Sequence, residues 1–321
     1  MVLERSIAPE LTASPMKKLF LLAAISFATV ASGSAALDTT KIDNLTGLKG
    51  KLNEKEGVYR VTFPRDDVKI VVDGWTMPPF MGLGTWAAFT KGAHTEAMVM
   101  GDTVLFEDEV NAAMSAALDN GLSVTALHNH FFFDQPKVYF MHIEGEGNLD
   151  KLAGAMRKMY DTTKGIRGPS AKPAASFPTA GQGQLPEKSS ITAAPLNEIF
   201  GMQGESKDGM VKFTIGRPAK MHGTSINKDM GVNTWAAFAG SDDNAVVDGD
   251  FAVTEDELQP VLRSLLDDKI NIVAIHQHMT YEEPRIMFFH YWGRGRAKDL
   301  ANAVKGGFLV GGLLKVSSPL P

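Results

Sequence analysis

The chain has 321 residues, enough for two domains of ordinary size, and its 44% hydrophobic and 21% charged residues are typical of a globular protein. Its net charge of -5, with no separate block of basic residues, argues against a nucleic-acid-binding surface. The absence of cysteine excludes disulfide bonds, thiolate metal ligands and a lipid-modified N-terminal cysteine. Any bound metal must therefore be held by histidine, carboxylate or methionine side chains.

Residues 1–36 have the pattern of a secretory signal peptide, with Met16 as an alternative start. Two lysines after Met16 are followed by an apolar run that ends at Val30 and by small residues up to Ala36. This apolar run is shorter than the roughly 20 residues that a membrane-spanning helix needs. We therefore expect an exported protein, periplasmic or secreted, with no transmembrane segment after signal cleavage.

An internal repeat organises the rest of the chain. The sequence Thr-Trp-Ala-Ala-Phe at residues 85–89 returns at residues 234–238, and Gly101-Asp102 returns as Gly249-Asp250. Self-similarity at a fixed spacing indicates copies of one structural unit. The expected organisation is repeat 1 at residues 37–164, a Gly/Pro/Ser-rich linker at residues 165–195 and repeat 2 at residues 196–321.

Hydrophobic periodicity predicts a β-β-α-β-β-α unit in each copy. In the first copy we expect strands at 86–90 and 97–101, a helix at 107–120, strands at 122–131 and 137–145, and a helix at 149–160. In the second copy we expect a helix at 255–268, strands at 270–279 and 285–293, and a helix at 297–304. Extra strands are expected at 57–63, 68–72 and 210–215. The predicted fold class is α+β: antiparallel-rich sheets with helices on one face, the two repeats packed as a pseudo-dimer that buries the uncovered sheet faces.

Each copy carries the pattern His-x-His-x11-His on a predicted hairpin. Alternation of side chains along a strand puts the first two histidines on one face, and a turn centred near Gln135 would set His128 opposite His142. Three imidazoles gathered in this way suit zinc or another divalent transition metal such as copper, nickel or iron. An open fourth position would hold a water whose pKa the metal lowers to about 7, which permits hydrolysis. The candidate ligands are His128, His130 and His142 in the first copy and His276, His278 and His290 in the second.

Two other roles for these histidines stay open. In the first, they are structural, partly buried and hydrogen-bonded, in a non-catalytic module that binds a small molecule or an envelope component. In the second, they act as acid–base groups without a metal. If one copy alone binds metal, the first is favoured, because Glu144 follows His142 on the same strand face where the second copy has Trp292. Trp86 and Trp235 are interpreted as core side chains rather than as a ligand-stacking wall.

Common catalytic signatures are missing: the chain has no Gly-rich phosphate loop, no Gly-x-Ser-x-Gly elbow and no His-Glu-x-x-His helix. No nucleotide cofactor is expected, no catalytic residue is assigned, and the sequence leaves open whether the protein is an enzyme. The Thr-Trp-Ala-Ala-Phe block, the Gly-Asp pair and the His-x-His strand end followed by a Pro turn resemble the LppY/LpqO family. That resemblance extends from about Leu37 to the C-terminus in two copies. It implies an exported bacterial domain of unknown function, without an established reaction.

Overall fold

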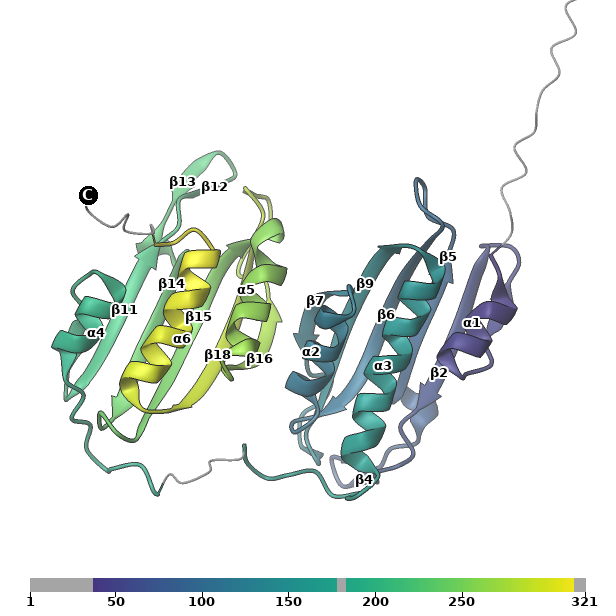
Figure 1. Ribbon diagram of the computed structural model, residues 1–321, viewed down its shortest axis with the longest axis horizontal. Coiled ribbons are helices and arrows are strands. Elements are labelled where there is room, and N and C mark those ends of the chain that lie inside the picture. The colour runs from purple at the N-terminus through teal and green to yellow at the C-terminus, as the bar shows by residue number, and fades with distance from the viewer. Residues whose placement is uncertain (1–36, 178–182, 315–321) are drawn as a thin grey trace, which may run out of the picture. The chain divides into compact units, whose positions relative to one another are not determined.

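The computed structural model describes residues 37–177 and 183–314, so the predicted signal peptide at residues 1–36 lies outside the described residues. The described chain is a mixed α+β structure of helices and antiparallel strands, as the periodicity predicts (Figure 1). None of its helices combines the length and the apolar composition needed to cross a membrane.

The elements of the first half follow one another in a defined order (Figure 1). They are α1 (Thr39–Thr46), β1 (Lys51–Asn53), β2 (Val58–Pro64), β3 (Val71–Val72), β4 (Trp75–Thr76), η1 (Pro79–Met81), β5 (Gly84–Thr90), β6 (Ala97–Phe106), α2 (Val110–Asp119), β7 (Ser123–His128), β8 (Asp134–Gln135), β9 (Val138–Gly147) and α3 (Leu149–Arg167).

The second half contains the same series of elements. They are α4 (Ala193–Phe200), β10 (Glu205–Lys207), β11 (Met210–Gly216), β12 (Ala219–Met221), β13 (Thr224–Ile226), η2 (Lys228–Met230), β14 (Asn233–Gly240), β15 (Ala245–Thr254), α5 (Glu255–Asp267), β16 (Asn271–His276), β17 (Glu282–Glu283), β18 (Ile286–Gly295) and α6 (Ala297–Val310).

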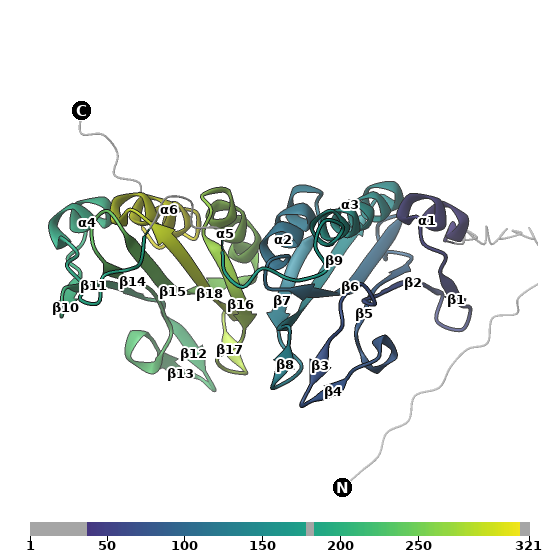
Figure 2. The same ribbon diagram turned by 90° about the horizontal axis from the view of Figure 1, so that it is seen from below.

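The long strands form one 12-stranded sheet in the order β1-β2-β5-β6-β9-β7-β16-β18-β15-β14-β11-β10. The order in the second half is the reverse of that in the first, and the halves meet at β7 and β16, where Leu127 pairs with Ile275. The helices cover one face of this sheet (Figure 2). On the other side, which we call the helix-free face, project two small sheets, β4-β3-β8 and β13-β12-β17 (Figure 2).

Strand alternation divides the buried apolar side chains between the two faces. Phe89 and Phe238 are fully buried in the main core, which includes the apolar stripes of the helices. Smaller apolar clusters lie around the two projecting sheets, with Phe106 and Phe140 in the first half and Phe288 in the second. The helix-free face is therefore only partly covered, and polar residues on it stay accessible.

Side-chain hydrogen bonds tie the halves together at their meeting strands. The Asn111 Oδ1 atom accepts a hydrogen bond from the Ile272 amide at 2.7 Å. In the opposite direction, Gln259 accepts from the Val124 amide at 2.9 Å and donates to the Val124 carbonyl at 2.8 Å. These contacts satisfy backbone groups next to irregularities in β16 and β7 that would otherwise lack a strand partner.

A buried ion-pair network fixes the start of α2. Glu109 is fully buried and accepts hydrogen bonds from Arg65 at 2.7 and 3.0 Å and from Arg167, at the end of α3, at 2.7 Å. Its counterpart Glu257 pairs with Arg217 at 2.7 Å, but the Glu257 side chain is 27% exposed. The first network thus joins three elements through a carboxylate that has no access to water.

Candidate metal centres

The structure brings the three histidines of each copy together on the helix-free face. His128 is the last residue of β7, His130 lies two residues beyond, and His142 is in the middle of β9. The His128 ring centroid lies 5.1 Å from those of both His130 and His142, with the rings stacked. In the second copy, the His276 ring lies between His278 at 5.1 Å and His290 at 4.9 Å.

The expected cross-strand pairing of the histidines is wrong by two residues. His128 pairs with Phe140 across β7 and β9, and His142 pairs with Ala126. The intervening residues do not form a tight hairpin, because Asp134 and Gln135 pair with β3 instead. The Asp134 carboxylate also accepts a hydrogen bond from the Val138 amide at 2.8 Å, which fixes where β9 begins. The first and last histidines are therefore diagonal neighbours, still within ring contact.

The second copy has the same shifted register, and the ring of its middle histidine in chain order, His278, packs on an aromatic side chain. His276 pairs with Phe288, and His290 pairs with Ala274. His278 stacks on the Phe288 ring at 3.4 Å, as His130 stacks on Phe140. These contacts hold the residue that follows the strand end, even though neither His130 nor His278 is itself in a strand.

A carboxylate that the sequence reasoning did not assign joins each cluster. Asp102 in β6 pairs with His142, and Asp250 in β15 pairs with His290. Both are buried, and the Asp250 Oδ2 atom lies 3.6 Å from the His278 Nε2 atom. The one sequence feature that could have indicated these aspartates is the Gly-Asp pair that occurs in both copies. Its glycine is explained by crowding, because a Cβ at Gly249 would meet the Tyr291 ring and the Trp235 carbonyl.

The donor atoms of the second copy lie close enough together to hold a metal ion. One donor atom each from Asp250, His276 and His278 lies within 4.8 Å of the other two. The His276 Nε2 and Asp250 Oδ1 atoms are buried and have no hydrogen-bond partner. Unsatisfied buried polar atoms are uncommon and are explained by a missing ion or water or by function. Among the described residues, the donors of the first copy do not meet this distance, so the geometry favours the second copy over the first.

The electrostatics of the second centre favour the neutral form of two of its imidazoles, His276 and His278. Burial and then the neighbouring imidazoles lower the pKa of His276 and of His278. Burial raises the pKa of Asp250 to about 7, against the opposing effect of His290. Neutral imidazoles have the free lone pair that a metal requires, and a cation would favour the ionised form of Asp250.

The first centre has the same tendencies. Burial raises the pKa of Asp102, although His142, His130 and His128 each oppose the shift. Burial and then the charge of His128 lower the pKa of His130. In both copies, burial therefore destabilises the ionised form of the carboxylate, and it lowers the pKa of His130 in the first copy and of His276 and His278 in the second.

A backbone contact orients the last histidine of the second centre. The His290 Nδ1 atom lies 3.3 Å from the Gly249 carbonyl oxygen. When the proton is on Nδ1, this N–H donates to the carbonyl and leaves Nε2 free as an acceptor. Metal-binding histidines are commonly oriented by such an outer hydrogen bond.

The tryptophans of the repeated block are not core residues, contrary to the preferred interpretation. Trp86 and Trp235 are only partly buried, and each pairs with the aspartate of its centre. Their outer faces carry cations, with the Arg60 guanidinium and the Lys212 ammonium each 4.1 Å from a ring centroid. Phe89 and Phe238, three residues later, point to the opposite face and are core residues.

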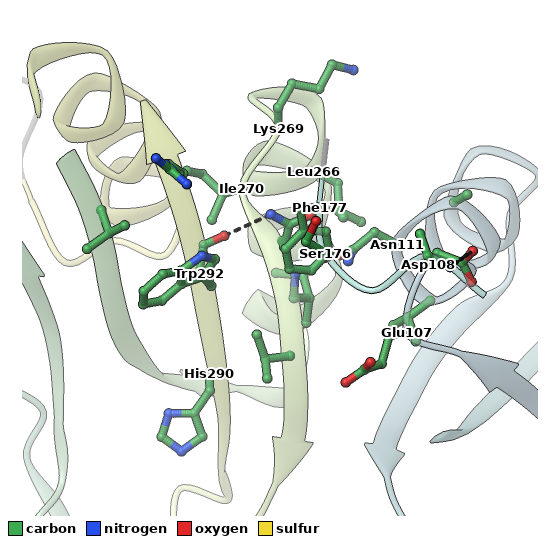
Figure 3. A pocket seen from close by; sticks show the side chains of 18 of the residues that line it. Glu107, Asp108, Asn111, Ser176, Phe177, Leu266, Lys269, Ile270, His290 and Trp292 are labelled. Carbon is green, nitrogen blue, oxygen red and sulfur yellow. Dashed lines mark hydrogen bonds between the residues drawn. The ribbon is translucent and has the colours of Figure 1, made fainter. Parts of the chain in front are cut away.

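A hollow of about 1110 Å³ adjoins the second centre. His290 and Trp292 line it from β18, while Glu107 and Asp108 lie across from them (Figure 3). The Asn271 side chain donates to the Trp292 carbonyl at 3.1 Å and borders the same space (Figure 3). A small molecule in this hollow would contact the centre through His290.

Comparison with known sequences assigns a family to both halves. Residues 40–162 and 194–308 each match the family described as Domain of Unknown Function (DUF1259). The chain belongs to this family and contains its domain in two copies. No curated protein matches the chain.

Solved structures offer only distant similarity. A trimeric bacterial microcompartment shell protein, PduB, is 11% identical over 81% of this chain and 89% of its own, with a TM-score of 0.22. The double-ringed trimeric shell protein MSM0271 from the RMM microcompartment is 11% identical over 79% of this chain and 98% of its own, with a TM-score of 0.18. Neither similarity is strong enough to indicate a shared function.

Proposed function

We propose that the protein binds a divalent transition metal, with zinc as the first candidate, at the second centre. The ligands would be Asp250, His276 and His278, with His290 beside them. The observation that carries this proposal is the pair of buried, unpartnered atoms, His276 Nε2 and Asp250 Oδ1, in a group whose donor atoms lie within 4.8 Å of one another. Two imidazoles and a carboxylate form a donor set that is common for zinc.

The first centre is proposed as a weaker site of the same kind. It has the equivalent residues Asp102, His128, His130 and His142, and the Asp102 Oδ1 atom is also buried without a partner. Its donor atoms are more widely separated, so metal binding there needs side-chain movement. We therefore expect lower affinity than at the second centre.

The competing function is a binding module in which the histidines are structural. The stacking of His130 on Phe140 and of His278 on Phe288 favours this view, since packed rings stabilise a fold without any metal. In that case the partly exposed Trp235 and the hollow beside Trp292 would be the functional surface. Metal analysis separates the two functions.

The experiment is elemental analysis and zinc titration calorimetry on untagged protein without residues 1–36. We expect about one equivalent of tightly bound metal, lost in Asp250→Asn and in His276→Ala/His278→Ala. The matched control is His128→Ala/His130→Ala, which changes the same residue types in the first copy and should keep the tight site. No binding of zinc, copper or nickel by any version would reject a metal centre and favour the structural role.

We further propose that each half contains one β-β-α-β-β-α unit, formed in the first half by β5, β6, α2, β7, β9 and α3, and that the two halves form a pseudo-dimer. The halves meet edge to edge at β7 and β16, so the expectation that the pseudo-dimer buries the uncovered sheet faces is wrong. The support is the reciprocal hydrogen bonding between Asn111 and Ile272 and between Gln259 and Val124. The two acceptors, Asn111 and Gln259, are 148 residues apart, and so are the two amide donors, Val124 and Ile272. The same spacing separates the repeated aspartates of the two centres. Export and membership of the LppY/LpqO group are proposed on the N-terminal pattern and the shared motifs alone.

A further inference from the structure

Large apolar side chains project from the small sheet β4-β3-β8 of the first half, from the turn before β8 and from η1, which follows β4. Phe80 is 98% exposed, Phe132 80% and Phe133 79%, and more than half of Trp75 is accessible. Folded proteins seldom expose neighbouring apolar groups without a use for them. We call Trp75, Phe80, Phe132 and Phe133 the apolar tip.

The second half shows that the fold does not require these apolar residues. Its equivalent positions carry Thr224 for Trp75, Asp229 for Phe80, Thr280 for Phe132 and Tyr281 for Phe133. The backbone is the same in both, since Phe133 and Tyr281 have φ of 59° and 61° and the turn residues Asp73 and His222 have φ of 48° and 50°. The apolar character of the first tip is therefore independent of the turn geometry.

Strand pairing places three of these side chains at one end of the small sheet. Val72 pairs with Trp75 on one side and with Asp134 on the other. The Asp73 amide donates to the Phe133 carbonyl, so the loop that holds Phe132 and Phe133 lies against the β3–β4 turn. This end projects from the helix-free face, away from the helices (Figure 2).

We propose that the apolar tip inserts into the interfacial region of a lipid bilayer. A stable protein interface buries about 800 Å² per partner from about 20–30 residues, which is far more contact than four side chains on separate turns can supply. Partial insertion of a few aromatic groups needs no such area, and aromatic side chains are favoured at the membrane interface.

The surrounding charges indicate which lipids would be bound. In the segments that flank the tip in sequence, the exposed charged residues include Asp66, Asp67 and Asp73 against Lys69 and Lys137, so these segments contain no basic cluster. Attraction to anionic lipids depends on such clusters of lysine and arginine. Binding should therefore rely on apolar insertion and should not require anionic lipid.

The test is co-sedimentation of metal-free protein lacking residues 1–36 with phosphatidylcholine vesicles. The variant Trp75→Thr/Phe80→Asp/Phe132→Thr takes each new residue from the equivalent position of the second half, so folding should be preserved, as circular dichroism and the melting temperature will show. We expect at least a tenfold lower partition coefficient for this variant. The matched control Met230→Ser/Tyr281→Ser, at exposed positions of the second half, should bind as the unmodified protein does.

Three results of the vesicle assay would overturn the proposal. They are no sedimentation of the unmodified protein with vesicles, equal binding of the triple variant, or a strict dependence on added phosphatidylglycerol. A dimer in analytical ultracentrifugation that the triple variant abolishes would likewise reject the bilayer and assign the tip to self-association. Because the assay uses metal-free protein, its result is independent of the proposed metal centre.

Discussion

The chemistry of Asp250 differs from that of an ordinary aspartate, because burial raises its pKa to about 7. Asp250 is nearly inaccessible, and its carboxylate oxygen Oδ1 has no hydrogen-bond donor. A group kept in a state that destabilises the fold is typical of functional sites, because selection for folding alone would remove it. The stability of the metal-free protein should therefore reveal the cost of this carboxylate.

Relative to the unmodified protein, the metal-free Asp250→Asn variant should be more stable at pH 8 than it is at pH 5. Burial raises the pKa of Asp250 to about 7, whereas an unfolded aspartate has a pKa near 4. The folded state thus binds the proton more tightly, and the free energy of unfolding falls as the pH rises from about 4 to 7. Asparagine cannot ionise and is free of this loss.

The measurement is the melting temperature of the variant and of the unmodified protein in the presence of a chelator. The difference between them should grow in favour of the variant from pH 5 to pH 8. Asp102→Asn is the matched variant in the first half and should change in the same direction, since burial also raises the pKa of Asp102. A difference that is constant with pH would show that Asp250 titrates normally.

At the scale of elements, the start of α2 is held more firmly than that of α5. Glu109→Gln should destabilise the protein by about 3–5 kcal/mol, since the change leaves Arg65 and Arg167 buried without their shared carboxylate. Glu257→Gln should cost only about 1 kcal/mol, because its single ion pair with Arg217 is partly exposed. Urea unfolding of both variants provides the comparison, and equal losses would contradict it.

The helices and long strands were predictable because their periodicity is strong. The helix expected at 255–268 is α5 (Glu255–Asp267), whose capping box joins Thr254 and Glu257. In contrast, α1 and α4 were not predicted, since an eight-residue helix has little periodic signal and gains its stability from packing. The linker expected at 165–195 overlaps the end of α3, which extends to Arg167, and the start of α4 at Ala193.

The centres were predictable only in part. The spacing of the histidines correctly indicated that they would gather, because one hairpin carries all three. Asp102 and Asp250 reach them from a different strand, and pairing between distant strands leaves no local pattern. The register between β7 and β9 was not predicted correctly because β8, which lies between them in the chain, pairs with β3. A two-residue strand has no sequence pattern that would reveal this pairing.

At the scale of the whole molecule, the halves share one sheet and one apolar core, and the side chains of Asn111 and Gln259 add hydrogen bonds between them. Asn111→Ala/Gln259→Ala would leave the Ile272 and Val124 amides without acceptors. Each unsatisfied amide costs about 1–3 kcal/mol. We expect differential scanning calorimetry of this double variant to show two transitions, one for each half, in place of one. A single transition with an unchanged midpoint would show that these contacts do not couple the halves.

The outer edges of the long sheet are built differently from its centre. The edge strands β1 and β10 are only three residues long, fully exposed and partly charged, which discourages pairing with other chains. The strands at the centre, β7 and β16, are longer and bury apolar residues such as Leu127 and Ile275. Growth of the sheet beyond the two halves is thereby opposed at both ends.

The meeting of β7 and β16 within one chain removes a restriction that a homodimer could not escape. In a homodimer, one mutation alters both subunits at once, so the two subunits must carry identical residues. A closely spaced set of metal donors in one half and a wider set in the other could then not occur together. The same holds for an exposed Phe132 in one half with Thr280 at the equivalent position of the other. A fused duplicate evolves each half separately. Each half is thus free to acquire its own property, which for the second half is the proposed metal centre and for the first half the proposed membrane-inserting tip.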